Sequence, residues 1–221
     1  MIPLRDTIRS RSFPIVNVSL IALNVVVFVF QLGLGQAGFE RFVGTYGVVP
    51  ARVVEGLAQA PLSPETWVPL FTAMFLHGNW FHILGNMLYL WVFGDNVEDT
   101  LGHRGYILFY LAVGLVGNFA HVLTNADSFI PTIGASGAVA GVLGAYFILF
   151  PRSRILALVP LLFILTFMEL PAVVFLFLWF GLQLLNGLTS IAAPGNLVAW
   201  WAHIGGFVAG MLLIKVLRPV K

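Results

Sequence analysis

The chain has 221 residues, of which 59% are hydrophobic and only 9% are charged. A water-soluble globule of this composition has too little polar surface to cover itself, so the sequence indicates a polytopic membrane protein. The formal net charge of +2 is too small and too dispersed for a nucleic-acid surface. The sequence contains no cysteine, which excludes a disulfide framework, a thiolate nucleophile and a Cys-ligated metal.

Six apolar segments predict an all-α membrane protein, a bundle of six transmembrane helices. They cover about 13–34, 79–93, 105–124, 136–150, 171–188 and 197–216, and their lengths approach or reach what a bilayer requires. Residues 1–12 form a short polar tail before them, and residues 218–221 form a second tail after them. Residues 13–217 are therefore expected to be one six-span domain.

Two stretches between these segments are less regular. Residues 35–76 mix charged and aromatic side chains with prolines, which indicates a partly interfacial loop with Trp67 and Trp80 at the level of the lipid headgroups. Residues 155–170 are apolar but short and are interrupted by Pro160. We expect them to be interfacial or re-entrant. The alternative is a seventh crossing, which would place the basic C-terminus opposite the basic N-terminus.

The distribution of basic residues favours six crossings. With six, nine of the eleven Lys and Arg residues lie on the side of the N-terminus, and only Arg41 and Arg52 lie opposite. Basic residues accumulate in cytoplasmic loops. We therefore expect both termini to be cytoplasmic, and we expect a multi-pass protein of a prokaryotic inner membrane.

Ser136 is the most conspicuous candidate nucleophile. It lies between Gly134 and Gly137 at the start of an apolar helix. The glycines leave its hydroxyl uncrowded, and the unpaired N–H groups of a helix N-terminus can stabilise an oxyanion. Small residues at helical spacing, continuing to Gly141, are equally typical of membrane helices that pack closely. The motif alone therefore does not establish a site.

Other polar residues are predicted at the depth of Ser136. Ser136 lies 16 residues before Arg152, and His203 lies 15 residues before Arg218, which places both about 22 to 24 Å above the inner boundary. By the same measure His82 reaches this level and Asn86 lies one turn lower. Intramembrane polar side chains are costly unless they face one another or a water-filled cavity, so this layer indicates a functional site.

These side chains suit acyl transfer. Ser136 would be the nucleophile and His203 its base. His82 and Asn86, four residues apart on one helical face, could donate hydrogen bonds to an oxyanion alongside the backbone N–H of Ser136. The outer half of the last segment contains no acidic residue, so the sequence favours a Ser–His dyad over a triad.

Glycines would allow the two catalytic helices to meet. Gly206 and Gly210 lie four residues apart on the last segment. This small face could approach the face formed by Gly137 and Gly141 closely enough for the serine and the histidine to touch.

These motifs resemble those of the rhomboid family of intramembrane serine proteases. G-A-S-G at Gly134–Gly137 resembles the nucleophile motif, and A-H-I-G-G-F-V-A-G at Ala202–Gly210 resembles the base motif. H-G-N-W-F-H-I-L-G-N at His77–Asn86 is similar to the family's second-span pattern. G-D-N-V-E-D-T-L-G at Gly94–Gly102 is similar to the turn that follows it.

The resemblance implies a rhomboid-like bundle and a role for each matching residue. Ser136 would be the nucleophile, His203 the general base and acid, His82 and Asn86 the oxyanion donors, Glu98 a structural anchor, and His77 a residue of the rim or of water access. Two positions depart from the family pattern. Trp67 is followed by Val68 where Arg is frequent, and Ala140 stands where some bacterial members carry a Tyr that stacks on the histidine.

Other functions find less support. The sequence has no H-E-x-x-H zinc motif, no G-x-G-D aspartyl motif and no phosphate-binding G-x-x-x-x-G-K. A transporter would carry polar residues along a continuous path and often an internal repeat. This sequence has one polar layer and no clear repeat. His121 and Gln183 are interpreted as helix–helix hydrogen-bonding residues. The segment 171–188, with Trp179, is either a lipid-facing aromatic stripe or a lateral gate.

The sequence thus predicts a serine endopeptidase that cleaves the transmembrane segments of membrane-anchored proteins. The alternative is a catalytically silent relative that binds transmembrane helices. The expected partners are transmembrane protein substrates and the lipid bilayer, with no nucleic acid, no metal and no cofactor.

Overall fold

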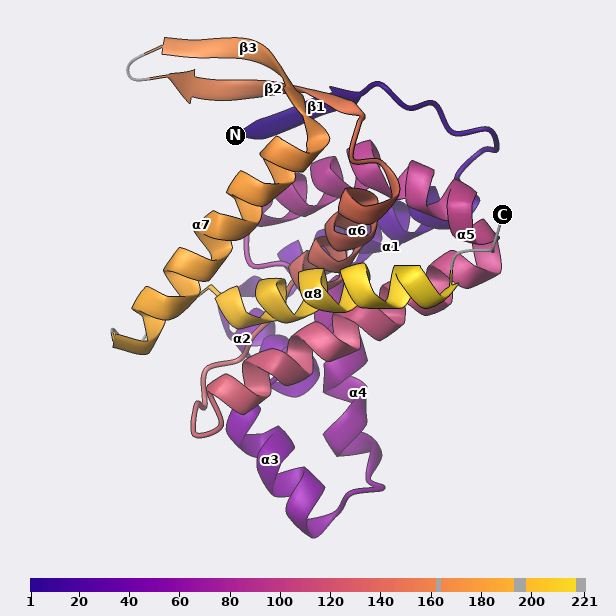
Figure 1. Cartoon of the computed structure of the whole chain (residues 1–221). Helices are drawn as coiled ribbons and strands as arrows, with labels where there is room; N and C mark the ends of the chain where they lie inside the picture. The colour runs from indigo at the N-terminus through magenta and orange to yellow at the C-terminus, as the bar shows by residue number, and fades with distance from the viewer. Residues whose placement is uncertain (162–163, 193–197, 218–221) are drawn as a thin grey trace.

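The fold combines a helical body with a small sheet (Figure 1). The computed structural model describes residues 1–161, 164–192 and 198–217. Its helices are α1 (Ile15–Leu32), α2 (Gly35–Tyr46), α3 (Pro50–Gln59), α4 (Pro64–Thr72), the 3-10 helix η1 (Ala73–Phe75), α5 (Trp80–Thr124), α6 (Ser136–Leu149), α7 (Ala172–Ala192) and α8 (Trp200–Leu217). Its strands are β1 (Ile2–Asp6), β2 (Arg154–Leu161) and β3 (Ile164–Pro171).

Four of the described helices, namely α1, α5, α7 and α8, are long and apolar enough to cross a membrane. Helix α6 is also apolar but has only 14 residues. A mostly helical membrane protein is therefore confirmed. The count of six crossings stays a prediction.

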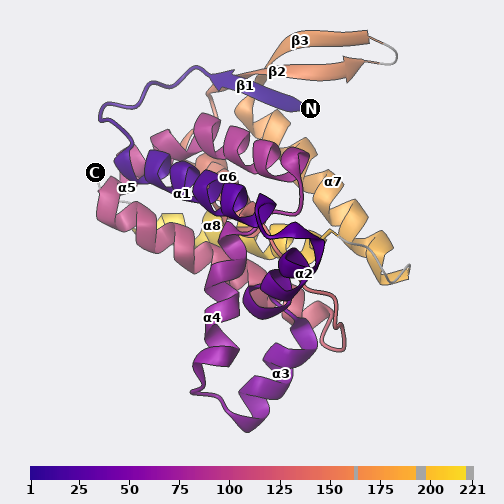
Figure 2. The same ribbon diagram turned by 180° about the vertical axis from the view of Figure 1, so that it is seen from behind.

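The 45-residue helix α5 doubles back at Gly102, whose φ of 69° and ψ of 163° are not helical. Glycine adopts a positive φ without the clash that a Cβ would cause. A Cβ on Gly94 would lie 2.6 Å from the hydroxyl oxygen of Tyr106, so the chain on the two sides of Gly102 packs side by side (Figure 2). Helix α5 thus has a first arm (residues 80–101) and a second arm (residues 103–124).

Glu98 joins the first arm of α5 to the start of α1. Its side chain is 1% exposed, and its carboxylate oxygens accept the backbone N–H groups of Val16 at 2.9 Å and Asn17 at 2.7 Å. The first N–H groups of a helix have no partner within the helix, and a negative charge there also complements the helix dipole. Nδ1 of His103 lies 2.6 Å from the same carboxylate. These contacts support a structural role for Glu98.

Helix α6 packs against α8 through backbone atoms. A Cβ added to Gly206 would overlap the carbonyl oxygen of Gly137, and one added to Gly210 would overlap that of Gly141. Helix α6 is also in contact with α5, and the three helices enclose much of the apolar core. The small-residue faces therefore meet as the sequence predicts.

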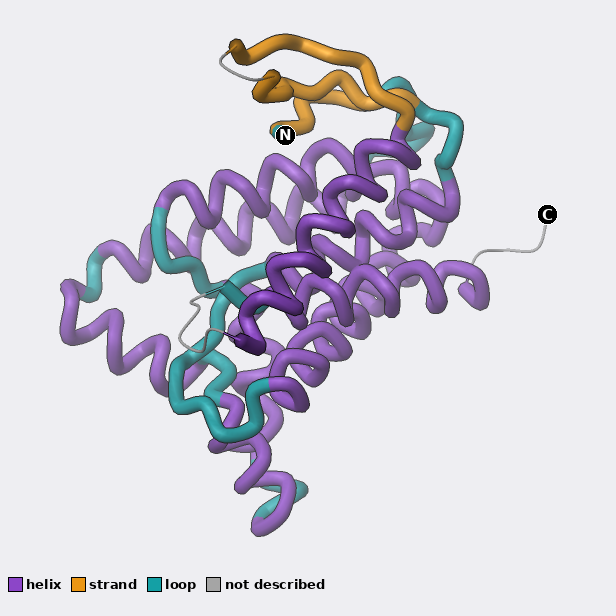
Figure 3. The backbone as a smooth tube through the Cα atoms, turned by 60° about the vertical axis from the view of Figure 1, so that its left-hand side comes forward, coloured by secondary structure: helices purple, strands orange, loops and turns teal. Residues whose placement is uncertain are grey.

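A three-stranded antiparallel sheet lies outside the helical body, beside the start of α7 (Figures 1 and 3). β2 is the central strand and pairs with β3 along its whole length, whereas β1 covers only residues 155–158 of β2. The all-α expectation is wrong here. Residues 155–161 and 164–170 form most of β2 and β3, and the predicted N-terminal tail contributes the third strand.

Pro160 explains why residues 155–170 do not form a helix. Proline in a helix interior removes a hydrogen bond and clashes with the preceding turn. In the sheet Pro160 pairs with Leu165 and lies beyond the part of β2 that β1 covers, so its missing N–H leaves no gap in the β1–β2 ladder. The β-branched and large apolar residues of this segment favour a strand.

Asp6 ties β1 to the helices. Its carboxylate accepts a hydrogen bond from Nδ2 of Asn96 on α5, at 3.0 Å, and another from the hydroxyl of Tyr146 on α6. Burial raises the pKa of the Asp6 carboxyl, and the hydrogen bond from Tyr146 opposes that shift. The sheet is therefore anchored to the helical body by a side chain as well as by the connections of β2 and β3 to α6 and α7.

The region between α1 and α5 is more ordered than the predicted interfacial loop, since it contains α2, α3, α4 and η1. Figures 1 and 2 place α3 and α4 at the end of the molecule opposite the sheet. The indole N–H of Trp67 donates to the carbonyl of Pro61 at 2.7 Å. Trp80 is 58% exposed and packs edge-on against Phe28.

Some predicted features lie outside the described residues. They are the C-terminal tail with Arg218 and Lys221, and the loop with Pro194 and Gly195 before the last segment.

The contact between α6 and α8 predicts that Gly206→Ala destabilises the protein by about 1 to 3 kcal/mol, because the added methyl group displaces the backbone of Gly137. The measurement is the free energy of unfolding in detergent. Gly181→Ala is the matched control, because no atom lies within 4 Å of a Cβ there, and helix propensity should stabilise that variant by up to about 1 kcal/mol. Equal effects of the two substitutions would contradict the packing argument.

Glu98→Gln is expected to lower the free energy of unfolding by about 1.5 to 3 kcal/mol, because the amide keeps the shape of the side chain but loses the charge that holds two backbone N–H groups. The same unfolding titration measures this effect. Glu55→Gln serves as the control, since Glu55 is exposed and bonds only the neighbouring Gln59 in its described contacts. A loss no larger than that of the control would show that the Glu98 charge does not stabilise the α1–α5 contact.

Candidate functional site

Ser136 and His203 lie in hydrogen-bonding contact. Ser136 is the first residue of α6, and its Oγ is 2.8 Å from Nε2 of His203 in the first turn of α8. The two residues are 67 positions apart in the sequence, and the backbone contact of Gly137 with Gly206 brings their helices together. Both side chains are partly buried. The geometry is that of a hydroxyl beside a base that can accept its proton.

Gly134 lies close to both His82 and Ser136. It precedes α6, its φ is 127°, and its N–H donates to the carbonyl of Ala73 at 2.9 Å. A Cβ at this position would lie 2.5 Å from Nε2 of His82 and 3.6 Å from Oγ of Ser136. Glycine is therefore required both by the backbone conformation and by the approach of the His82 ring.

A cavity of about 540 Å³ joins the four side chains that the sequence places at one depth. Ser136, His203, His82 and Asn86 all line it. The other lining residues are Asn79, Phe81, Gly85, Tyr89, Ile133, Val139, Trp179, Gln183, Val198 and Ala199. Polar groups from three helices thus converge on one hollow with mostly apolar walls, which is the usual form of a small-molecule or peptide site.

His82 and Asn86 are placed by the start of α5. The side chain of Asn79 accepts the backbone N–H of His82 at 2.9 Å, which caps this helix. His82 and Asn86 are then one helical turn apart, so both project to the same side. Asn86 is 8% exposed and His82 is partly buried.

His77 does not lie at the rim of the cavity, so the rim expectation is wrong, whereas a role in water access stays a prediction. It is fully buried, and its Nε2 accepts a hydrogen bond of 3.0 Å from Nδ2 of Asn86. The amide of Gln31 on α1 bonds both the N–H and the carbonyl of His77, at 3.0 and 3.3 Å. His77 therefore contacts Asn86 on one side and is hydrogen-bonded by Gln31 of α1 through its backbone. Its burial cannot be inferred from sequence spacing, because its partner Gln31 comes from α1, 46 positions earlier in the chain.

Gln183 is a neighbour of His203 that the sequence analysis did not connect with the site. Its Oε1 lies 2.8 Å from Nδ1 of His203, on the side of the ring away from Ser136. The prediction of a helix–helix hydrogen bond at Gln183 is confirmed, because this contact joins α7 to α8. The rings of Trp179 and Trp200 flank the imidazole, with centroids 6.3 and 5.9 Å away.

His121 is not part of the cavity. Its Nε2 lies 2.9 Å from Oγ1 of Thr132, and its Nδ1 lies 3.3 Å from Nδ2 of Asn125. It thus secures the loop between α5 and α6 and does not bridge two helices. Within residues 1–161, 164–192 and 198–217, no group of three or more His, Asp or Glu side chains lies close enough together to hold a metal ion.

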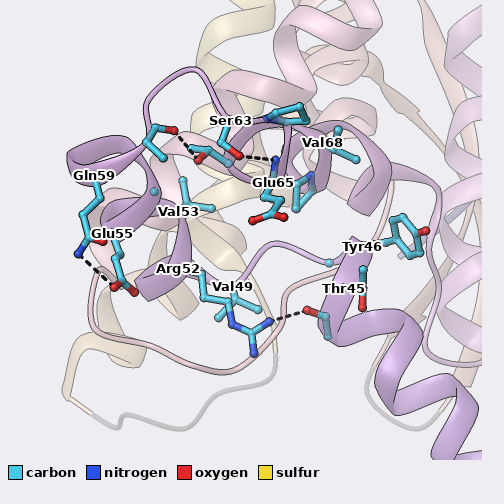
Figure 4. Close-up of a pocket in the computed structure, with 17 residues that line it drawn as sticks. Thr45, Tyr46, Val49, Arg52, Val53, Glu55, Gln59, Ser63, Glu65 and Val68 are labelled. Carbon is cyan, nitrogen blue, oxygen red and sulfur yellow. Dashed lines mark hydrogen bonds between the residues drawn. The ribbon is translucent and has the colours of Figure 1, made fainter.

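A separate cavity of about 590 Å³ lies among α2, α3 and α4 (Figure 4). Several of its polar side chains bond locally: Arg52 donates to the carbonyl of Gly44, and Gln59 donates to Glu55. The described residues that line it include Ser63 but no histidine. The described lining of this hollow therefore lacks a serine–histidine contact like that of Ser136 with His203.

Similar proteins come from several organisms. The chain is 26% identical to the mitochondrial presenilin-associated rhomboid-like protein of Mus musculus over 163 residues, which are 70% of this chain and 39% of that protein. It is 29% identical to mitochondrial rhomboid protein 1 of Saccharomyces cerevisiae, over 88% of this chain and 51% of that protein. It is 31% identical to rhomboid protease GluP of Bacillus subtilis, over 57% of this chain and 22% of that protein.

The chain spans about two-fifths of the length of the mouse protein and about half of the yeast protein. Both of these relatives are mitochondrial, which does not fit the expected prokaryotic inner membrane. The apolar helices and the relatives together establish an integral membrane protein.

The family comparison covers most of the chain. The family model described as Rhomboid domain matches residues 64–220, a range that contains Ser136, His203, His82 and Asn86 and the glycine faces of α6 and α8. Because the match extends over more than half of the sequence and includes the elements that build the cavity, the chain belongs to the rhomboid family.

Proposed function

We propose that the protein is an intramembrane serine endopeptidase that cleaves transmembrane segments of membrane-anchored proteins. The observation that carries this proposal is the 2.8 Å contact between Oγ of Ser136 and Nε2 of His203 at the wall of a cavity. A serine hydroxyl is a weak nucleophile until a base accepts its proton, and this contact provides the base.

The proposed reaction has two halves. Oγ of Ser136 attacks the carbonyl carbon of the scissile peptide, its proton passes to Nε2 of His203, and the carbonyl oxygen takes the negative charge. The C–N bond then breaks, and His203 gives the proton to the leaving amine nitrogen, which leaves an acyl ester on Ser136. Water next attacks the ester and gives a proton to His203. That proton returns to Oγ of Ser136 as the carboxylic acid leaves.

Three groups are proposed to donate hydrogen bonds to the oxyanion. In this proposal they are the backbone N–H of Ser136 at the start of α6, the ring of His82 and the amide of Asn86. The amide nitrogen of Asn86 has two N–H groups, and one of them is directed to Nε2 of His77. Such donors act most strongly in a site with few competing waters, as a partly buried cavity provides.

The proposed topology has six crossings: α1, the two arms of α5, α6, α7 and α8. Both termini then lie on the side with most of the basic residues, and Arg41 and Arg52 lie on the other side. Ser136 begins α6 and His203 lies in the first turn of α8, so in this topology the cavity belongs to the half of the protein nearer Arg41 and Arg52. A helical substrate hides its carbonyls in hydrogen bonds, so local unwinding must precede attack, which favours substrates with small or helix-weakening residues near the cleaved bond.

Ser136→Ala and His203→Ala are each expected to lower cleavage of a model transmembrane substrate by at least about 10³-fold, because each removes one member of the nucleophile–base pair. The measurement is product formation by purified protein reconstituted in liposomes. Undiminished cleavage by either variant would reject the mechanism. If the wild-type protein binds but does not cut a range of transmembrane peptides, the catalytically silent alternative is the better description.

His82→Ala and Asn86→Ala are each expected to lower kcat by about 10²-fold or more, with a smaller effect on KM, because an oxyanion donor acts mainly in the transition state. Leu84→Ala is the control on the same helix, since Leu84 is 60% exposed and does not line the cavity. An unchanged kcat in both cavity variants would exclude these side chains as oxyanion donors.

A further inference from the structure

The side of the His203 ring away from Ser136 faces an uncharged amide. Nδ1 of His203 is 2.8 Å from Oε1 of Gln183, whereas Nε2 is 2.8 Å from Oγ of Ser136. Both ring nitrogens therefore have one partner each, and the partners lie on different helices, α7 and α6. Gln183 is 8% exposed and lines the same cavity as the serine.

The amide of Gln183 is oriented by a second hydrogen bond. Its Nε2 donates to the carbonyl of Trp179 at 3.2 Å. A carbonyl can only accept, so the NH₂ group must face Trp179 and the oxygen must face His203. Because the amide oxygen can only accept a hydrogen bond, Nδ1 of His203 must carry the proton that it donates to Gln183. A neutral imidazole with its proton on Nδ1 has a free lone pair on Nε2, which is the form that can take the proton of Ser136.

We propose that Gln183 is the positioning residue of His203, which fixes its ring and selects the tautomer that is competent as a base. The inference rests on the proposed proteolytic function and supplies the orienting group that the sequence analysis found missing. In serine enzymes with a triad a carboxylate performs this task. Here a neutral amide performs it, and no second charge has to be buried at membrane depth.

The packing of α7 supports a specific role for Gln183. Its neighbours Leu182, Leu184 and Leu185 are 52%, 39% and 58% exposed, as expected for a helix that faces lipid. An amide on the inward face of such a helix is costly to bury unless it is hydrogen-bonded. Both ends of the Gln183 amide are bonded, one of them to the residue proposed as the base. A leucine would fill this position at lower cost if packing were its only task.

The test compares Gln183→Leu with Gln183→Glu in the full chain, reconstituted with a model transmembrane substrate. The Leu variant removes the acceptor and is expected to lower kcat about 10- to 100-fold with KM nearly unchanged. The Glu variant restores an acceptor oxygen and is expected to recover about tenfold over the Leu variant. Asn186→Leu, which removes an amide from the same helix outside the described cavity lining, should keep the wild-type kcat.

A second readout separates positioning from packing. Nitrogen NMR of the imidazole rings, with His203→Ala used for assignment, should show the wild-type His203 protonated on Nδ1. The Leu variant should show a mixture of the two neutral tautomers. The thermal unfolding midpoint of each variant in detergent should be measured first. A variant with a lowered midpoint is then assayed, beside the wild type, at a temperature at which both are folded.

The outcomes distinguish this inference from the proposed function. Suppose that Ser136→Ala and His203→Ala are inactive, whereas Gln183→Leu keeps the wild-type kcat and the Nδ1 proton of His203. Gln183 then does not position the base, and the proteolytic proposal stands. If Ser136→Ala still cleaves, the proteolytic proposal fails first. A Glu variant as slow as the Leu variant, with an unchanged tautomer in both, also overturns the inference.

Discussion

The direct backbone contact between α6 and α8 is the constraint on which the rest of the structure depends. The carbonyl oxygens of Gly137 and Gly141 occupy the space that side chains at Gly206 and Gly210 would fill. Because the helices touch at this distance, Ser136 at the start of α6 meets His203 in the first turn of α8. Side chains between the helices would separate them by several ångströms, and no rotamer change could restore a 2.8 Å contact.

Much of this arrangement could be predicted from the sequence. Glycines at four-residue spacing predict close helix packing, and the rise per residue of a helix predicts that Ser136, His82 and His203 lie at one depth. All three side chains line one cavity. The sheet could not be predicted in the same way. Residues 155–170 are apolar with no clear period, and their pairing with β1 depends on a segment about 150 residues earlier in the chain.

The partner of His203 was missed for a different physical reason. The outer half of the helix that carries His203 has no acidic residue, and the partner of His203 is a neutral side chain from another helix, α7. Gln183 stands out in the sequence as a polar residue in an apolar span. The sequence does not show which neighbouring helix it faces, because the residues around it are apolar on every side of the helix. His77 shows the same limit, because its burial depends on Gln31 of α1.

The two contacts of His203 differ in how firmly their helices are held. Helix α6 meets α8 through backbone atoms, which leaves no side-chain rotation to absorb a displacement. Helix α7 is more exposed and meets α8 through side chains such as Phe180, which stacks on Phe207. A small movement of α7 would therefore alter the hydrogen bond of Gln183 before it altered the distance between Ser136 and His203. The contact between Ser136 and His203 thus belongs to the closely packed core, whereas Gln183 lies on the helix that is least buried among the four described helices able to cross a membrane.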